Sequence, residues 1–201
     1  MMIKRVFDLM IVLLFFPLIL FLLVIISIYL MLTISSPIFF VQTRAGKNGK
    51  PFRLYKFRTM ANKINQKKDN FESERKRVLK STYFLRLLKF DEIPQFFNII
   101  KGDLTLVGPR PLLVEYNELY NLEQKKRLSV LPGLTGWAQI NGSNNISWKK
   151  KFELDIYYVK NQNFFLDTKI IILTIFYLIK KIIKGSNSKE KIIGKKFNGK
   201  N

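Results

Sequence analysis

The sequence contains no cysteine and no histidine among its 201 residues. The absence of cysteine excludes a disulfide framework, a thiol nucleophile and a cysteine-ligated zinc site. The absence of histidine excludes Ser-His and Cys-His catalysis and removes the commonest metal ligand. Catalysis would therefore use Asp, Glu, Lys, Arg, Tyr or backbone groups. A bound metal would take oxygen ligands, which indicates Mg²⁺ and hence a phosphorylated substrate.

Acidic residues are scarce as well. The chain carries 35 Lys and Arg against 14 Asp and Glu, a formal net charge of +21. An excess of this size predicts an anionic partner, which is a nucleic acid, an anionic membrane surface or a phosphorylated substrate. Charge alone does not separate nucleic acid from membrane. The N-terminal part favours the membrane, because residues 9–43 contain no charged side chain.

The apolar N-terminal segment is long enough to span a bilayer as one helix. Lys4 and Arg5 precede it and further basic residues follow it, so the positive-inside rule places both ends on the cytoplasmic side. Pro17 should also kink the helix. A broken, re-entrant helix satisfies both observations and is preferred over a single span. We therefore expect a re-entrant membrane helix-break-helix at residues 1–36 and a cytosolic and interfacial catalytic domain at residues 37–201.

The segment after the apolar run alternates apolar and polar residues around a glycine-containing centre. This pattern predicts a short β-hairpin with strands at residues 39–43 and 52–57. Lys56 and Arg58 are two residues apart, so both cations should lie on one face of the second strand. That face is either simply solvated or part of a binding site.

Most of the remaining chain is predicted to be helical. Residues 62–80 read as a surface loop that runs into a helix, residues 147–167 as an amphipathic helix, and residues 169–184 as an apolar helix at the membrane interface. The last of these has a lysine-rich end that suits anionic lipids. The predicted fold class is α+β and mainly helical, with a membrane helix, a short hairpin and amphipathic interfacial helices on a small catalytic domain.

Two adjacent acids, Asp91 and Glu92, stand among apolar residues in the stretch KFDEIPQFFN. Carboxylates in such a setting are costly to desolvate unless cations pair with them. Pro94 suits the first turn of a following helix, and this places both acids at a helix N-terminus, where they are stabilised and where phosphate also binds. Arg86 and Lys89 lie within about one and a half helical turns, so the two acids are expected in a cationic setting that keeps them ionised. The pair is therefore either a structural ion-pair group or a working site.

Two loops add further candidates. Arg110 lies between two prolines in GPRPLL, and a stiff backbone suits an arginine that forks onto phosphate oxygens. An exposed turn arginine is the alternative. The glycine-containing loop LPGLTGWAQINGSNN carries Gln139 and Asn141, whose amides are weaker candidates for contacts with a nucleobase or a sugar.

Taken together, YKFRTM, FDEIPQFFNIIKGDLTLVGPRPLL, PGLTGWAQINGSN and WKKKFELDIYYVKN resemble the successive signatures of the monotopic phosphoglycosyl transferases, a family of bacterial sugar transferases. The similarity runs in order over nearly the whole chain. The size resembles that of the minimal, Campylobacter-type members that start N-linked protein glycans. The resemblance implies transfer of a sugar 1-phosphate from a UDP-sugar to polyprenyl (undecaprenyl) phosphate with release of UMP, through a covalent aspartyl-phosphosugar and with Mg²⁺. It also implies a re-entrant helix broken at a proline, here Pro17.

The resemblance also implies roles for individual residues. By position, Asp91 would be the nucleophile, and Glu92 would either help to hold Mg²⁺ or act as a base in the second half-reaction. Both are candidate metal ligands. Cations are needed because a carboxylate that approaches a diphosphate meets like-charge repulsion. The residues expected to bind phosphate oxygens are Lys56, Arg58, Arg86 and Arg110.

Three positions depart from the family pattern. Phe16-Pro17 stands where Ser-Pro is usual, which puts the geometry of the membrane break in doubt. Leu131 and Ser143 stand where the family commonly has arginine, which leaves the sugar open. An N-acetylated sugar, diacetylated bacillosamine among the candidates, is expected. UDP-galactose or UDP-glucose for capsule or O-antigen is the alternative.

The partners follow from this interpretation. We expect a UDP-sugar, polyprenyl phosphate and anionic inner-membrane lipids, at the cytoplasmic face of the bacterial inner membrane in a monotopic arrangement. A homodimer is compatible with the sequence. Nucleic acid is not expected, because a membrane-anchored nucleic-acid binder would leave Asp91 and Glu92 unexplained. A catalytically inactive scaffold is the third alternative, and the intact acids and Arg110 count against it.

Overall fold

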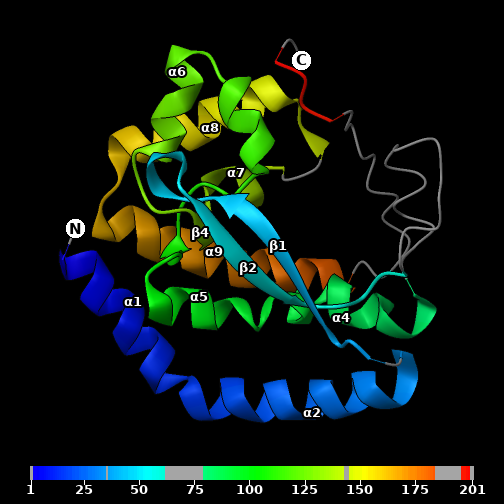
Figure 1. The fold of residues 1–201 in the computed structure, drawn as a ribbon. Helices are drawn as coiled ribbons and strands as arrows, with labels where there is room; N and C mark the ends of the chain where they lie inside the picture. The colour runs from blue at the N-terminus through cyan, green and yellow to red at the C-terminus, as the bar shows by residue number, and fades with distance from the viewer. Residues whose placement is uncertain (1, 35, 62–78, 143–144, 184–195, 200–201) are drawn as a thin grey trace. The chain divides into compact units, whose positions relative to one another are not determined.

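The computed structural model describes residues 2–34, 36–61, 79–142, 145–183 and 196–199 (Figure 1). The predicted surface loop at residues 62–80 lies almost wholly outside these ranges. In chain order the elements are α1 (Met2–Leu14), α2 (Phe16–Ile34), β1 (Phe39–Ala45), η1 (Lys47–Gly49), β2 (Pro51–Phe57), η2 (Lys80–Thr82), α4 (Tyr83–Leu87), η3 (Phe90–Glu92), α5 (Gln95–Lys101), β3 (Thr105–Val107), η4 (Val114–Glu118), α6 (Leu122–Lys125), η5 (Lys126–Leu128), β4 (Gly133–Thr135), α7 (Trp137–Ile140), α8 (Trp148–Asn161) and α9 (Phe164–Ile183). Helices dominate, and the predicted α+β class is confirmed.

The chain forms two compact units. Unit 1 combines Met1–Gln42 with Arg53–Gly102, and unit 2 combines Thr43–Phe52 with Asp103–Asn201. The division runs through the β-hairpin, so each unit takes part of it. This division into units reflects how the chain packs. The predicted boundary after residue 36 is of another kind, because it separates a membrane segment from a cytosolic domain, and it stays a prediction.

The apolar N-terminal segment consists of two helices that meet at Phe15. Figure 1 shows α1 and α2 as two rods with a clear change of direction between them. Pro17 is the second residue of α2, where its missing N–H removes one backbone hydrogen bond from the ladder across the junction. Among the described helices, α2 alone is long and apolar enough to cross a membrane, by length and composition. The break near Pro17 is thus observed, and re-entry into one leaflet stays a prediction.

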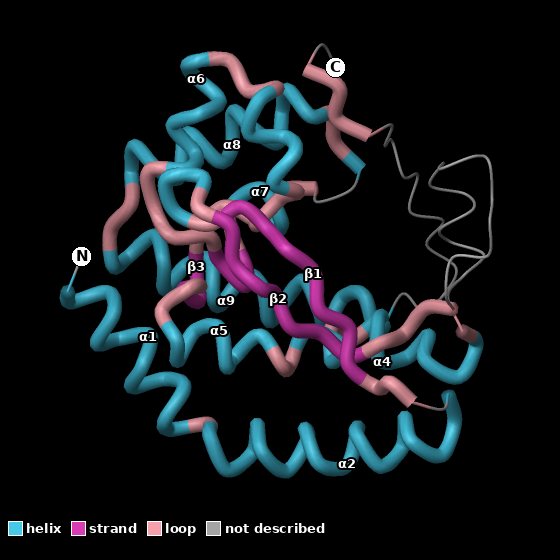
Figure 2. Tube along the Cα trace, in the orientation of Figure 1, coloured by secondary structure: helices cyan, strands magenta, loops and turns pink. Residues whose placement is uncertain are grey.

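The predicted hairpin is confirmed, with strands slightly longer than expected. Figure 2 shows β1 and β2 side by side, joined by the short turn that contains η1. The turn needs left-handed backbone at Asn48 and Gly49, which have φ values of 56° and 74°. These are residue types that tolerate this conformation. β2 therefore has β1 on one edge and no second strand on the other edge within the described sheet.

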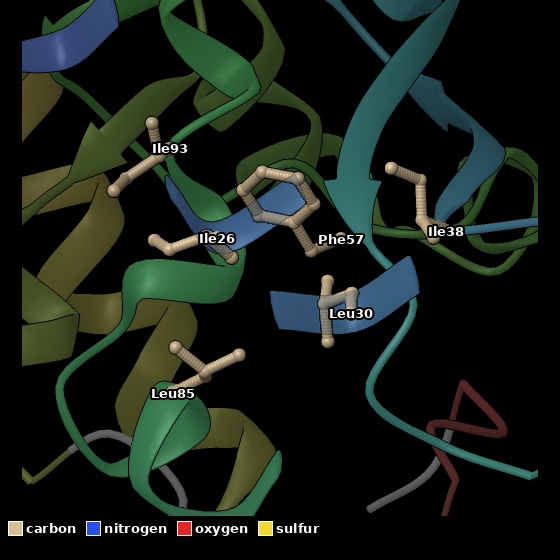
Figure 3. Packing of buried hydrophobic residues seen from close by; sticks show 6 residues of the cluster. All are labelled: Ile26, Leu30, Ile38, Phe57, Leu85 and Ile93. Atoms are coloured by element: carbon tan, nitrogen blue, oxygen red, sulfur yellow. The ribbon is translucent and has the colours of Figure 1, made fainter. Parts of the chain in front are cut away.

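A hydrophobic cluster forms the core of unit 1. In Figure 3 the Phe57 ring lies among aliphatic side chains from several segments. The buried members of the cluster are Ile26, Leu30, Ile38, Phe57, Leu85 and Ile93. Three of them directly adjoin candidate site residues in the sequence, because Phe57 follows Lys56, Leu85 precedes Arg86 and Ile93 follows Glu92. One apolar core therefore anchors the three segments that carry these polar side chains.

Unit 2 is built on a short parallel pair of strands, with Thr105 opposite Gly133 and Val107 opposite Thr135. Gly108 and Gly133 lie where the backbones of these two segments are in close contact, and a Cβ on either glycine would overlap the backbone of the other segment. This explains the glycines in the two loop motifs. The predicted helices at residues 147–167 and 169–184 are observed as α8 and α9. A second core consists of the aromatic rings of Tyr116, Tyr120, Phe152 and Phe197, of which Phe152 belongs to α8.

Candidate active site

Asp91 and Glu92 lie in a tight turn just before α5. Lys89 adopts a left-handed conformation with φ 63°, η3 follows, and Pro94 then precedes the first residue of α5. The acids were expected at the N-terminus of a helix, and the structure places them in a separate 3-10 turn that precedes α5. Ile93, which precedes the proline, is helical at φ −52° and ψ −41° although extended backbone is the usual preference there. The 3-10 turn η3 therefore continues into α5 without an extended residue between them.

Both carboxylates are buried, at 7% and 6% residue exposure. Glu92 Oε1 accepts a hydrogen bond from Lys56 Nζ at 2.7 Å and lies 4.0 Å from Lys89 Nζ. Lys56 therefore faces the acidic pair, as a site residue should. Asp91 differs, because its Oδ1 is buried and has no hydrogen-bond partner in the described part of the chain.

Burial raises the pKa of Asp91, and the neighbouring Glu92 raises it further. Lys56, Lys89 and Arg86 act in the opposite direction, with smaller effects on the pKa. The sequence predicted a cationic setting that keeps both acids ionised. The cations are present, but around Asp91 they do not outweigh desolvation. A carboxylate with a raised pKa and an unsatisfied oxygen is typical of a functional site rather than of a structural ion pair.

Arg86 and Arg58 are held close to the same core. Arg86 Nη1 donates to Thr59 Oγ1 at 3.3 Å. Arg58 Nη2 donates to the carbonyl of Ile34, the last residue of α2, at 2.7 Å. Arg58 thereby caps the C-terminus of a helix, a structural contact that the sequence did not suggest. Binding of phosphate by either arginine stays a prediction.

Asn98 is a residue that sequence reasoning missed. Its side chain is fully buried on α5 and contacts the backbone of β2. Asn98 Nδ2 donates to the carbonyl of Arg53 at 2.7 Å, and Tyr55 N donates to Asn98 Oδ1 at 3.2 Å. The available signal was an amide within the apolar run QFFNII, which is costly to bury unless it forms hydrogen bonds.

In unit 2, the backbone of Arg110 is fixed by a buried ion pair. Arg127 Nε donates to Asp155 Oδ2 at 3.0 Å, and Arg127 Nη2 forms an ion pair with the same oxygen at 2.9 Å. Nη2 donates its hydrogen bond to the Arg110 carbonyl at 2.7 Å. Burial raises the pKa of Asp155, and Arg127 limits that rise. The sequence did not single out Arg127 or Asp155, because charged residues in helices are usually solvated.

Gln139 and Asn141 both donate hydrogen bonds within their own loop. Gln139 Nε2 donates to the carbonyl of Leu134 at 3.1 Å, and Asn141 Nδ2 to the carbonyl of Trp137 at 2.8 Å. These contacts stabilise the loop, and binding of a sugar or a base by these amides stays a prediction. Leu131, one of the departures from the family pattern, lies half-buried just before β4, and Ser143 lies outside the described residues.

The predicted site residues thus fall into two groups. Unit 1 contains Lys56, Arg58, Arg86, Asp91 and Glu92. Lys56 contacts Glu92, the charges of Lys56 and Arg86 act on Asp91, and Arg58 contacts the end of α2. Unit 2 contains Arg110, Gln139 and Asn141. The group in unit 1 is the candidate active site.

The carboxylates of unit 1 fit a magnesium ion that also binds phosphate. No group of three or more His, Cys, Asp or Glu side chains lies together among the described residues. Mg²⁺ does not need one, because it is usually held by one or two carboxylates, waters and substrate phosphates. Asp91 Oδ1, buried and without a hydrogen bond in the described structure, is available as such a ligand.

The sequence model of the bacterial sugar transferases matches residues 1–181. The chain belongs to the bacterial sugar transferase family. Among its relatives, the uncharacterized sugar transferase EpsL of Bacillus subtilis is 49% identical over 168 residues, which are 84% of this chain and 82% of EpsL. The family membership confirms the predicted enzyme class, a phosphoglycosyl transferase.

Two further relatives are named for the reaction that they catalyse. The UDP-glucose:undecaprenyl-phosphate glucose-1-phosphate transferase of Escherichia coli is 39% identical over 160 residues, 75% of this chain and 34% of that protein. The UDP-N-acetylgalactosamine-undecaprenyl-phosphate N-acetylgalactosaminephosphotransferase of Aeromonas hydrophila is 35% identical over 180 residues, 86% of this chain and 43% of that protein. This chain therefore spans less than half the length of either. The apolar helix α2 and the family together indicate a membrane-associated protein. The predicted likeness to Campylobacter-type members stays a prediction.

Proposed function

We propose that this sugar transferase moves a sugar 1-phosphate from a UDP-sugar to undecaprenyl phosphate and releases UMP. The observation that carries the proposal is the buried Asp91–Glu92 turn, in which one carboxylate is paired with Lys56 and the other has an oxygen without a hydrogen bond in the described residues. The proposal is supported by relatives that are named for this reaction with glucose and N-acetylgalactosamine.

In the proposed first half-reaction, a carboxylate oxygen of Asp91 attacks the sugar-linked phosphorus of the UDP-sugar. The bond from this phosphorus to the bridging oxygen breaks, UMP leaves, and an aspartyl-phosphosugar remains. In the second half-reaction, a phosphate oxygen of undecaprenyl phosphate attacks the same phosphorus. The bond to Asp91 breaks, the carboxylate is regenerated and the lipid carries the sugar on a diphosphate.

The surrounding residues have separate tasks in this proposal. Lys56 holds Glu92 in place at 2.7 Å, and Arg86 and Lys89 supply positive charge near Asp91. Cations placed before the reaction offset the repulsion between the carboxylate and the incoming diphosphate. Mg²⁺, held by Asp91 and Glu92, would neutralise the phosphate charge when bound. Glu92 is either a metal ligand only or also the base that accepts a proton from the lipid phosphate.

The sugar and the location belong to the proposal too. An N-acetylated sugar, diacetylated bacillosamine included, is our first candidate, and glucose or galactose is the alternative. The relatives are named for both kinds of sugar, glucose in one and N-acetylgalactosamine in the other. We place the enzyme at the cytoplasmic face of the inner membrane beside anionic lipids, with α1 and α2 as a re-entrant pair. Single cysteines introduced at Met2 and Asn48 of this cysteine-free chain should then be labelled from the same side.

A UMP-release assay tests the reaction. Purified protein, Mg²⁺, undecaprenyl phosphate and a panel of UDP-sugars should yield UMP with at least one donor, and Asp91→Asn should abolish release while membrane association is kept. Phe165→Asn, a change at an exposed residue of α9, is a control that should keep activity. Substantial turnover by Asp91→Asn would refute the assignment of the nucleophile.

A further inference from the structure

We propose that Asn98 is a positioning residue of the site, because its side-chain amide fixes β2 against α5 and thereby holds Lys56 on Glu92. The proposal rests on the proposed function for its kinetic consequences. It rests on geometry alone for its structural part. All of the residues involved belong to unit 1.

The two hydrogen bonds of Asn98 imitate a neighbouring strand. The amide donates to the carbonyl of Arg53 and accepts from the N–H of Tyr55, the groups on either side of Leu54. In a parallel sheet, one residue of the adjacent strand makes this same pair of bonds, to the carbonyl before and the N–H after the residue beside it. Asn98 thus stands in for one residue of a strand on the edge of β2 that β1 does not occupy.

The register fixed in this way determines where Lys56 points. Lys56 is two residues beyond Leu54 and contacts Glu92, whereas Phe57 on the opposite face of β2 enters the hydrophobic core. A slip by one residue would shift the strand by about 3.3 Å and exchange its two faces. Lys56 would then leave Glu92, and the acid would stay buried without this partner.

The Lys56–Glu92 pair is too weak to hold the register by itself. The lysine side chain is partly exposed, at 18%, and has many rotamers to restrict. Asn98 is fully buried, and it bonds to backbone groups that cannot rotate away. The amide therefore sets the position of the strand, and the lysine follows.

A double-mutant cycle distinguishes positioning from a general structural role. We expect Asn98→Leu, which keeps the approximate size of the side chain but removes both bonds, to lower kcat/KM for UMP release by about tenfold. In a Lys56→Met background the same substitution should lower it by less than about twofold, because Asn98 acts through Lys56. An equal loss in both backgrounds would overturn the proposal. Asn98→Asp, which keeps the acceptor for Tyr55, should give an intermediate loss and replaces Asn98→Leu if that variant does not fold.

A matched control is available at the other end of the hairpin. Asn117 Nδ2 donates to the carbonyl of Gly49 at 3.1 Å, so it also ties the hairpin through an amide, but within unit 2. Asn117→Leu should lower the melting temperature and leave kcat/KM unchanged. A loss of kcat/KM as large as that of Asn98→Leu would show that any weakened hairpin contact has this effect, and would contradict the proposal.

A structural measurement keeps the inference independent of the proposed reaction. The chain has no cysteine, so Lys56→Cys with Glu92→Cys supplies the only two thiols for a short bis-maleimide cross-linker. Adding Asn98→Leu should lower the yield of the cross-link severalfold, whereas Asn117→Leu should not. An unchanged yield would overturn the positioning role. Failure of the wild-type enzyme to release UMP with any donor would instead refute the proposed function.

Discussion

Removal of the buried guanidinium of Arg127 should destabilise unit 2 strongly. Arg127 and Asp155 are 3% and 4% exposed, and Arg127 Nε donates to Asp155 Oδ2 while Nη2 lies 2.9 Å from the same oxygen. Arg127→Met leaves Asp155 buried without this partner, which costs about 3–5 kcal/mol in comparable cases. For a chain of this size, each kcal/mol lowers the melting temperature by about 2–4 °C, so we expect a loss of about 6–20 °C.

The assay is thermal unfolding followed by tryptophan fluorescence. Both tryptophans, Trp137 and Trp148, lie in unit 2, so their emission reports on the unit that contains the ion pair. Because burial raises the pKa of Asp155, the penalty of Arg127→Met should shrink as the pH falls and the unpaired carboxyl becomes protonated. Arg127→Met combined with Asp155→Leu removes both charges and should recover most of the loss.

An exposed ion pair provides the control. Glu123 pairs with Lys126, and the two side chains are 49% and 52% exposed. Glu123→Gln should lower the melting temperature far less than Arg127→Met, because exposed ion pairs are weak. If Arg127→Met lowered the melting temperature no more than Glu123→Gln, the buried ion pair would not stabilise unit 2 as we expect.

Three further outcomes are expected. Asp91→Asn should raise the melting temperature at pH 8, because the raised pKa of Asp91 means that the ionised carboxylate destabilises the fold. This gain should vanish as the pH falls toward 3.8, the ordinary pKa of an aspartate side chain. A pH series of melting curves that shows no gain would contradict this. Leu30→Ala, at a fully buried position of α2, should cost about 2–5 kcal/mol by denaturant titration, while Leu32→Ala at an exposed position of the same helix should cost far less; similar losses would refute the packing of α2 on this core. Chelation of Mg²⁺ with EDTA should stop UMP release without a change in melting temperature above about 2 °C, and restored Mg²⁺ should recover it; full activity in EDTA would exclude the ion.

The sequence was sufficient to predict the regular elements. Strong local signals mark them: a long apolar run with an internal proline, strand alternation around a turn, and helical periodicity near the C-terminus. The hairpin was therefore placed close to its observed bounds, and both C-terminal helices were predicted, although the break between them lies at residues 162–163 and not at 168. The family motifs also placed Asp91, Glu92 and Lys56 in one site, and the Lys56–Glu92 contact agrees with this.

The tertiary contacts could not be predicted in the same way. Three contacts join residues that are 17 or more positions apart in the sequence. Asn98 bonds to the backbone of β2, Arg58 bonds to the end of α2, and Arg127 bonds to the carbonyl of Arg110. No local pattern encodes such pairs. The raised pKa of Asp91 also depends on how completely the fold buries the turn. The neighbouring cations in the sequence suggested instead that the carboxyl would be kept ionised.

The covalent bond between the enzyme and the sugar phosphate is the claim on which the account depends. Intact-protein and peptide mass spectrometry of the wild-type enzyme, quenched in acid after incubation with Mg²⁺ and its UDP-sugar in the absence of undecaprenyl phosphate, tests it directly. We predict that the protein gains the mass of one sugar phosphate, carried by the peptide that contains Asp91, and that undecaprenyl phosphate removes it. Product formation without such an adduct on Asp91 would contradict the account.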